Sequence, residues 1–222
     1  MIKYILFDLD DTLLDFHASE KEALRQALKD NLDIDMTINM YNKYKDINEE
    51  YFNKFTQGIF DRSEMHKKRF EIFLDYLNIT YDPVIINQSY MTNLANGAEL
   101  FKDSINILTY LKNKDYKLYI ATNGIKGIQI NRLNKANILH YFDYIFVSSE
   151  IGYNKPSKLF FDYIFNYIKD FNTSSYCIIG DREESDILGG YNSNITTIKL
   201  GKIDNSKANY LINNLLEIKD IL

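Results

Sequence analysis

Carboxylates follow the first apolar run of the chain: Asp8 and Asp10 come directly after Ile5-Leu6-Phe7. A short apolar run bounded by polar residues is typical of a buried strand in a parallel sheet, and such strands end at the crevice where α/β sheets bind ligands. On an extended backbone Asp8 and Asp10 point the same way, so their charges repel unless a cation or a proton lies between them. The pair predicts a metal site, a shared proton or both. The alternative is an acidic turn in which Thr12 caps a helix.

Three more polar clusters are predicted at strand ends or in loops on the same side of the sheet. They are Thr122-Asn123, Lys155-Pro156, and Gly180-Asp181 together with Asp186. Each has a simpler interpretation, since Thr122 could cap the next helix and Lys155 could be an exposed loop lysine. Asp186 could be a charge on a helix face. Their coincidence at one crevice favours a single functional site.

Phosphoryl transfer uses all of these groups. Mg²⁺ prefers oxygen ligands and would absorb the repulsion among Asp8, Asp10 and Asp181. A carboxylate can then attack a phosphoryl group and form an aspartyl-phosphate. Mg²⁺ and Lys155 would supply positive charge, and the Thr122 hydroxyl would supply a hydrogen bond. Asp10 would protonate the leaving oxygen and later deprotonate water.

Alternating strands and helices must position these residues. We expect strands at 5–7, 117–121, 144–147, 176–179 and 196–200. We expect helices at 104–114, 128–137 and 157–169, a short one from Glu184, and a last one at 207–221. Strands separated by helices make a parallel sheet that is covered on both faces, so the fold class is α/β, doubly wound.

The segment 15–97 shows no strand pattern. Helical spacing of apolar residues predicts helices at about 19–32, 36–55, 62–77 and 83–94, with a break at Gly58 and an N-cap at Asp82-Pro83. We therefore expect a core of residues 1–14 and 98–222 and an all-helical insertion of residues 15–97. An insertion at that point would stand over the carboxyl end of the first strand and act as a lid.

Composition excludes several classes of protein. A chain of 222 residues buries a core without staples, and Cys177, the single cysteine, reads as a core position. The net charge of −5 argues against a nucleic-acid polymer as partner. No apolar stretch is long enough to span a membrane and no signal-peptide pattern appears, so we expect a cytoplasmic protein.

The four motifs, in the order Asp8-Leu9-Asp10-Asp11-Thr12, Thr122-Asn123, Lys155-Pro156 and Gly180-Asp181…Asp186, resemble the haloacid dehalogenase (HAD) superfamily. The resemblance implies a HAD-like hydrolase core, with Asp8 as nucleophile and Asp10 as general acid/base. It also implies Mg²⁺ held by Asp8, the Asp10 carbonyl, Asp181 and Asp186, the last directly or through water. Phosphate binding would fall to Thr122, Asn123 and Lys155, and the insertion would be the family's helical cap.

Asp10 points to a phosphatase, because the haloalkanoate dehalogenases and phosphonatases of the family lack a carboxylate there. The run from Thr122 through Gly124 and Gln129 to Leu133 is similar to the pyrimidine 5′-nucleotidase and acylneuraminate-9-phosphatase subgroup. So is Ser149-Glu150-Ile151-Gly152 before Lys155. Two departures stand out: Arg182-Glu183-Glu184 replaces a usual Ser or Thr, which puts access to the metal in doubt, and Asn194 replaces a usual glycine.

The sequence thus predicts a Mg²⁺-dependent phosphatase of small phosphate monoesters, with a nucleoside 5′-monophosphate as the favoured substrate. A sugar-phosphate phosphatase, a phosphosugar mutase and a non-enzymatic binding protein remain as alternatives. A monomer and a homodimer are both compatible with the sequence. Insertion residues that could face the substrate, although each also reads as structural, are Phe16, Gln57, Phe60, Arg62 and Arg69.

Overall fold

The computed structural model describes residues 1–201 and 203–222. The chain divides into two compact units, a core unit of residues 1–16 with 98–222 and a helical unit of residues 17–97. Within the described residues, no helix is both long and apolar enough to cross a bilayer.

The strands among the described residues are β1 Tyr4–Phe7, β2 Lys117–Thr122, β3 Tyr144–Val147, β4 Tyr176–Gly180, β5 Thr196–Leu200 and β6 Tyr210–Ile212. The α-helices are α1 Phe16–Leu32, α2 Ile38–Thr56, α3 Arg62–Tyr76, α4 Pro83–Leu94, α5 Ser104–Asn113, α6 Lys126–Lys135, α7 Ser148–Ile151, α8 Lys158–Ile168 and α9 Leu188–Asn192. Shorter helical turns are η1 Leu139–Tyr141, η2 Thr173–Ser175, η3 Glu183–Ile187 and η4 Leu215–Asp220.

A six-stranded sheet in the order β3-β2-β1-β4-β5-β6 forms the centre of the core unit. Every neighbouring pair is parallel, so all strands end on the same edge. Phe7, the last residue of β1, lies opposite Ile120 of β2 and Ile179 of β4. The polar residues that follow β1, β2 and β4 therefore emerge side by side. The predicted α/β fold is confirmed.

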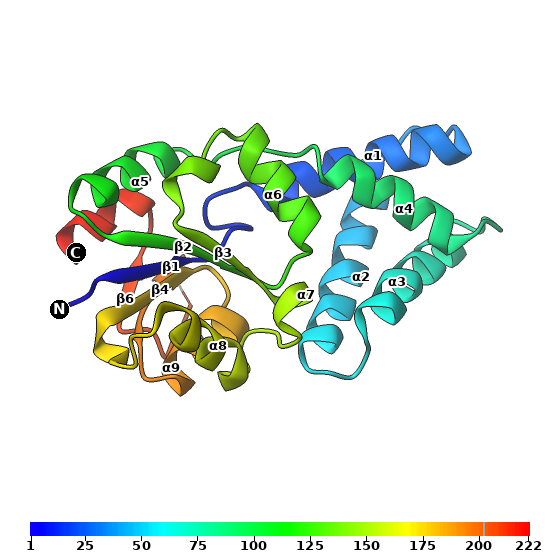
Figure 1. The fold of residues 1–222 in the computed structure, drawn as a ribbon. Helices are drawn as coiled ribbons and strands as arrows, with labels where there is room; N and C mark the ends of the chain where they lie inside the picture. The colour runs from blue at the N-terminus through cyan, green and yellow to red at the C-terminus, as the bar shows by residue number, and fades with distance from the viewer. Residues whose placement is uncertain (202) are drawn as a thin grey trace. The chain divides into compact units, whose positions relative to one another are not determined.

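The sheet is buried on both faces because its apolar residues alternate. Ile5 and Phe7 pack into one cluster, together with residues of α5, α6 and η4. Leu6 joins a second cluster with residues of α8. Figure 1 shows α5 and α6 on one side of the strands and α8 and α9 on the other. Cys177 is fully buried in the first cluster, as predicted.

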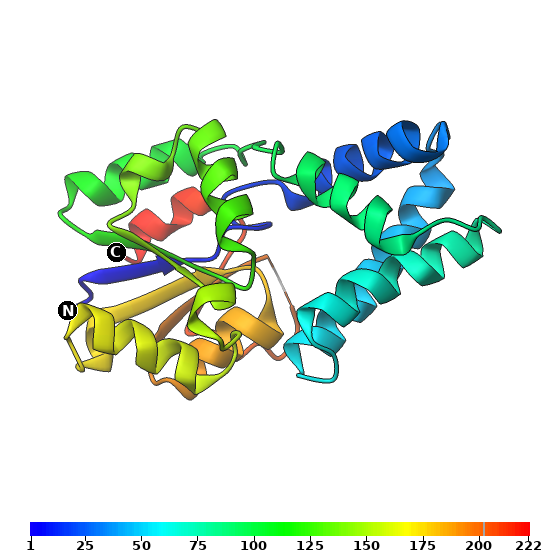
Figure 2. The same cartoon turned by 45° about the vertical axis from the view of Figure 1, so that its right-hand side comes forward.

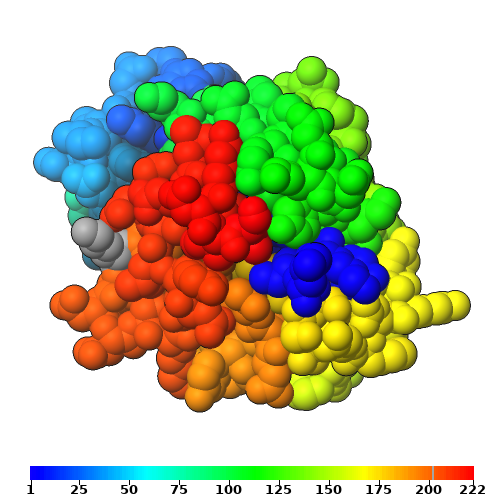
Figure 3. Space-filling view, turned by 90° about the vertical axis from the view of Figure 1, so that its left-hand side faces the viewer, coloured from blue at the N-terminus to red at the C-terminus, as the bar shows by residue number. Residues whose placement is uncertain are grey.

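The amino ends of the central strands lie at the surface opposite the edge that carries the polar clusters. The space-filling view in Figure 3 shows the first residues of the chain (blue) exposed there, beside the C-terminal segment (red). Lys3 ties this end together, because its N–H donates to Ser175 and its carbonyl accepts from Lys117. These backbone bonds extend the β2-β1-β4 pairing beyond β1 and help to hold its register.

The helical unit is built from α1 to α4 (Figure 2). Helix α4 begins as predicted, with the Asp82 side chain accepting from the Val84 N–H and proline at the first helical position. Gly58 lies between α2 and α3 in the left-handed region, with φ of 76°. An aromatic cluster fills the interior: Tyr44 packs against Phe70, Phe73 and Tyr90 at centroid distances of 5.2 to 5.5 Å.

Four of the five insertion residues named above make structural contacts. Arg69 is buried and donates to Asn48 and Asn87. The Phe60 ring stacks on Tyr51, and the Arg62 guanidinium lies over Phe55. Phe16 begins α1 and lies under the guanidinium of Arg132. Gln57 is the C-cap residue of α2.

The predicted helix at 207–221 is wrong. Tyr210–Ile212 form β6, which pairs with Ile198–Leu200, and only the turn η4 follows. The apolar residues Leu211, Leu215 and Ile218 have helical spacing, but the exposed edge of β5 offers a ladder of backbone hydrogen bonds that outweighs this local preference. The side chain of Asn209 sets the register, because it accepts from both the N–H and the hydroxyl of Thr197.

Asn194, one of the two departures from the family pattern, occupies a position that suits glycine. Its φ is 56°, in the left-handed region, at the turn that links α9 to β5. Asparagine adopts this conformation more easily than other residues with a side chain, so it serves in place of glycine here.

Close packing of α9 on the sheet predicts that Gly190→Ala destabilises the protein. A Cβ at Gly190 would lie 2.5 Å from Thr197 Cγ2 and 2.6 Å from Ile178 Cγ2, both on buried β-branched side chains. Overpacking of this kind costs about 1–3 kcal/mol. Urea unfolding followed by circular dichroism measures the loss. Gly127→Ala in α6 is the matched control, since its Cβ would meet nothing within 4 Å, and an equal loss in both variants would contradict the packing argument.

Candidate active site

Asp8 extends β1 by one residue. Its N–H donates to the Ile179 carbonyl at 2.8 Å, so the backbone is still paired with β4 when the carboxylate enters the site. After Asp10 the chain reverses: Asp11 adopts φ of 54°, and the N–H groups of Leu13 and Leu14 both bond to the Leu9 carbonyl. This turn buries Thr12, whose hydroxyl donates to Asp181 at 3.4 Å. Thr12 therefore links the first motif to the fourth instead of capping a helix.

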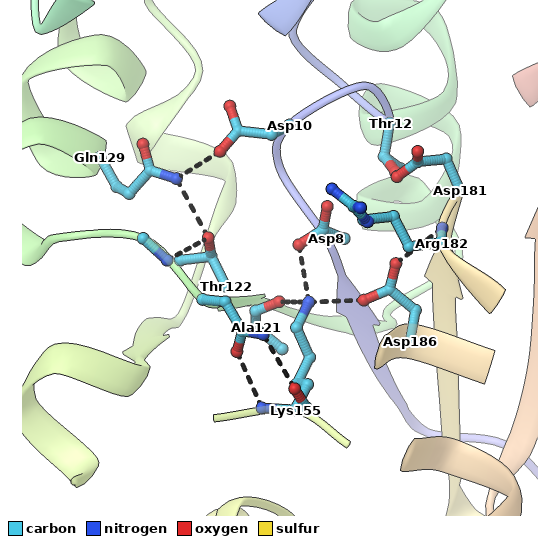
Figure 4. A network of polar contacts seen from close by, with 12 residues as sticks. Asp8, Asp10, Thr12, Ala121, Thr122, Gln129, Lys155, Asp181, Arg182 and Asp186 are labelled. Atoms are coloured by element: carbon cyan, nitrogen blue, oxygen red, sulfur yellow. Dashed lines mark hydrogen bonds and ion pairs between the residues drawn. The ribbon is translucent and has the colours of Figure 1, made fainter. Parts of the chain in front are cut away.

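Lys155 is the buried cation of the site, with 1% of its surface exposed. Its Nζ donates to Asp8 Oδ1 and to Asp186 Oδ1, each at 2.6 Å, and to the Ala121 carbonyl (Figure 4). The Asn123 side chain fixes the loop that carries it: Asn123 Oδ1 accepts from the Lys155 N–H at 2.8 Å, and Nδ2 donates to the Lys155 carbonyl at 2.9 Å. The structure thus places Lys155 inside the crevice and Asn123 behind it.

Asp181 and Asp186 follow β4. A Cβ at Gly180 would lie 2.3 Å from Asp186 Oδ2, so the absence of a side chain at 180 lets the Asp186 carboxylate approach the end of the strand. Asp186 Oδ2 accepts from the Arg182 N–H at 3.1 Å. The buried side chain of Lys199 reaches from β5 and donates to the Asp181 carbonyl.

The segment Arg182-Glu183-Glu184 is the other departure from the family pattern, and the Arg182 N–H still bonds to the Asp186 carboxylate. The Glu183 carboxylate accepts hydrogen bonds from the Ser206 hydroxyl at 2.7 Å and from the Lys207 N–H at 2.8 Å. Its carboxylate therefore links Ser206 and Lys207 to η3.

Thr122, at the end of β2, accepts hydrogen bonds from the Gly124 N–H at 3.1 Å and from Gln129 Nε2 at 3.0 Å. Because its oxygen accepts twice, the hydroxyl hydrogen can point to a third group. Gln129 Nε2 also donates to Asp10 Oδ2 at 2.8 Å (Figure 4). In the sequence, Gln129 stands out only as part of the run that resembles the nucleotidase subgroup. Arg132, which forms an ion pair with Asp10, was not predicted to belong to the site.

Negative charge exceeds positive charge in the crevice. Burial raises the pKa of Asp8 well above its ordinary value; Lys155 lowers it, and Asp186, Asp181 and Asp10 raise it further. Burial, with the charges of Asp186 and Asp11, raises the pKa of Asp181 to about 7. For Lys155 burial lowers the pKa, but Asp186 and Asp8 outweigh it and the net direction is upward. One lysine does not neutralise this cluster.

The donor set fits Mg²⁺. Carboxylate oxygens of Asp8, Asp181 and Asp186 lie within 4.8 Å of one another. Hard oxygen ligands at this spacing, with an excess of negative charge, are what a small divalent cation prefers. The Asp10 side chain is turned toward α6, where it contacts Gln129 and Arg132 and is not part of this group.

Comparisons with known proteins give matches over most of the chain. A family model described as haloacid dehalogenase-like hydrolase matches residues 5–200. The HAD-hydrolase YfnB of Bacillus subtilis is 35% identical over 193 residues, 87% of this chain and 81% of YfnB. Its crystal structure, described as bound to magnesium and as revealing interdomain movement, has a TM-score of 0.93 at 33% identity and covers 100% of this chain and 98% of that chain.

Two other relatives carry a named activity. The pyrimidine 5′-nucleotidase PynA of Streptococcus pneumoniae is 34% identical over 200 residues, 88% of this chain and 82% of that protein. A glyceraldehyde 3-phosphate phosphatase of Methanocaldococcus jannaschii is 30% identical over 231 residues, 100% of this chain and 97% of that protein.

The raised pKa of Asp181 predicts how Mg²⁺ stabilises the protein. Between about pH 4 and about pH 7 the folded metal-free protein holds a proton that the unfolded chain has released, so its free energy of unfolding falls as the pH rises. Mg²⁺ binds the deprotonated carboxylates, so the rise in melting temperature on adding Mg²⁺ should be larger at about pH 8 than at about pH 5.

Melting curves in excess EDTA and in excess Mg²⁺ at the two pH values measure this difference. Asp181→Asn should remove most of the Mg²⁺ shift, whereas Asp162→Asn, on the outer surface of α8, should leave it unchanged. An equal shift at both pH values would contradict the coupling between Mg²⁺ binding and the deprotonation of Asp181.

Proposed function

Because the chain belongs to the haloacid dehalogenase-like hydrolases and is a phosphoric monoester hydrolase of that family, we propose that it hydrolyses small phosphate esters through an aspartyl-phosphate on Asp8. The observation that carries the proposal is the buried ion pair of Lys155 with Asp8, set within the three-carboxylate cluster. A carboxylate held beside a buried ammonium group and a metal site is oriented to attack phosphorus. The resemblance drawn from the motifs is confirmed at the level of the family.

In the first step Asp8 forms a bond to phosphorus and the bond from phosphorus to the ester oxygen breaks. In this proposal Lys155 supplies positive charge beside the phosphoryl group, the Thr122 hydroxyl donates to a phosphoryl oxygen, and Asn123 keeps Lys155 in position. Asp10, which must enter this step protonated, gives its proton to the leaving oxygen, so that an alcohol departs. Bound at Asp8, Asp181 and Asp186, with the Asp10 carbonyl, Mg²⁺ would supply positive charge against the phosphoryl oxygens.

In the second step water attacks the phosphorus of the aspartyl-phosphate. Asp10 takes a proton from this water, and the bond between phosphorus and Asp8 breaks. Inorganic phosphate leaves, and both carboxylates return to their starting states. A phosphosugar mutase would instead keep water away at this stage, so release of phosphate separates the two activities.

The helical unit serves as the cap in this proposal. The description of YfnB as showing interdomain movement supports a cycle in which residues 17–97 move relative to the core unit. Closure would exclude bulk water during transfer, and opening would release the product.

Substitution of the two aspartates should separate their roles. Asp8→Asn should abolish turnover, because an amide is a poor nucleophile. Asp10→Asn keeps the backbone carbonyl but supplies neither acid nor base, so turnover should fall about 10²–10⁴-fold. With p-nitrophenyl phosphate, whose leaving group hardly needs an acid, hydrolysis should become limiting and phosphate should accumulate on Asp8.

Rapid quench followed by mass analysis of the peptide that carries Asp8 detects this adduct. Asp162→Asn is the control for loss of a carboxylate on the core unit. If Asp8→Asn keeps substantial activity and Asp10→Asn shows no adduct, direct attack by water is the better mechanism.

We propose pyrimidine nucleoside 5′-monophosphates as the preferred substrates, ahead of sugar phosphates. The motif from Thr122 to Leu133 and the relation to PynA support this order. The kcat/KM values for uridine and thymidine monophosphates should exceed those for adenosine monophosphate and glyceraldehyde 3-phosphate. A preference for the triose phosphate, in line with the archaeal relative, would reverse the order without changing the reaction.

A further inference from the structure

The carboxylate of Asp10 is held from one side by helix α6. Arg132 Nη1 forms an ion pair with Asp10 Oδ1, and Gln129 Nε2 donates to Oδ2 at 2.8 Å. Both residues are buried, with 1% and 2% of their surfaces exposed. Each oxygen of the proposed acid/base therefore has its own donor on the same helix, one turn apart.

The direction of the Gln129 amide follows from Arg132. A guanidinium group carries only donors, so the Gln129 atom facing it must be the oxygen, and Oε1 does accept from Arg132 Nη1 at 3.2 Å. Nε2 then points the other way, where it donates to Asp10 and also to the Thr122 hydroxyl at 3.0 Å (Figure 4). Gln129 thus ties the proton-transferring group to the residue proposed to hold the phosphoryl group.

The backbone leaves room for this side chain. A Cβ at Gly124 would lie 2.6 Å from Gln129 Nε2 and 2.7 Å from its Cδ and Cγ. Any side chain at 124 would displace the amide from its contact with Asp10. Gly124, Gln129 and Arg132 therefore pack together, with Gln129 in contact with both of the others.

Resting on the proposed function, we propose that Gln129 and Arg132 are positioning residues that hold the Asp10 carboxylate in the orientation required for proton transfer. Aspartate is short, so rotation of its side chain moves the carboxyl oxygens by more than proton transfer tolerates. A displacement of about 1 Å can cost about 10²-fold in rate. Arg132 acts on Asp10 directly and also through Gln129, since without it the amide is free to turn over.

The test compares Arg132→Met, Arg132→Lys and Gln129→Leu on two esters, an alkyl phosphate and p-nitrophenyl phosphate. Lys135→Met and Asn134→Leu, exposed on the same helix, are the matched controls and should behave like the unaltered protein. Arg132→Met should lower turnover of the alkyl ester about 10- to 100-fold with little change in KM. Arg132→Lys should recover part of that loss.

With p-nitrophenyl phosphate, Arg132→Met should release about one equivalent of p-nitrophenolate in a burst, before a slow steady state. A phosphoryl adduct should form on Asp8 at the same time. When Arg132→Met is added to Asp10→Asn, it should change turnover less than about 2-fold, because its effect passes through the missing carboxylate. A crystal structure of Arg132→Met should show Asp10 rotated.

A merely structural role would give a different pattern. Equal losses on both esters, no burst, and a full further loss in the Asp10→Asn background would overturn the proposal. So would a crystal structure of Arg132→Met with the Asp10 carboxylate unmoved. If the unaltered protein with Mg²⁺ hydrolyses neither ester, the proposed function fails, and the position of Asp10 in that crystal structure still decides whether Arg132 positions it.

Discussion

Burial of the Lys155 ammonium group among carboxylates is the constraint on which the site depends. A buried charge without a partner costs several kcal/mol, so Lys155 is tolerated only while Asp8 and Asp186 face it. The three residues come from three separate segments, and parallel pairing at one edge of the sheet is what brings them together. Because Phe7 of β1 lies opposite Ile179 of β4, Asp8 emerges beside the loop that carries Asp181 and Asp186. A slip of one residue would turn the Asp8 side chain to the other face of the sheet.

At two glycines a polar side chain of the site lies directly against the backbone. At Gly180 the missing side chain admits the Asp186 carboxylate, and at Gly124 it admits the Gln129 amide. Neither glycine has a positive φ, so backbone freedom does not explain them. Both serve to let a polar side chain from a later helical segment reach the end of a strand. The same requirement, space for a polar side chain, therefore explains glycine at both positions.

The sequence predicted the parts of the site that lie where strands end, because a change from apolar to polar residues marks those positions directly. Asp8, Thr122 and Asp181 are of this kind, and the structure places each at the same edge of the sheet. The roles of these residues remain a proposal. Arg132 could not be found in this way, since its partner Asp10 is 122 positions away and a charged residue on a predicted helix usually faces solvent. Strand β6 was missed for a related reason: its pairing partner β5, not its own residue pattern, decides its conformation.

Asp8 and Asp10 are the same residue type two positions apart, and their surroundings differ. Asp8 faces Lys155, which comes from the loop before α8, and shares its space with Asp181 and Asp186. Asp10 faces away from that cluster, toward Arg132 and Gln129 of α6. Under the proposed function the first environment suits a nucleophile, because a buried cation and a candidate metal site lie beside its oxygens. Under the proposed function the second suits proton transfer, because Arg132 and Gln129 hold the carboxylate apart from the three-carboxylate cluster. When neighbouring carboxylates have separate partners, the partners assign the roles, and here each partner comes from a different helix–strand unit of the sheet.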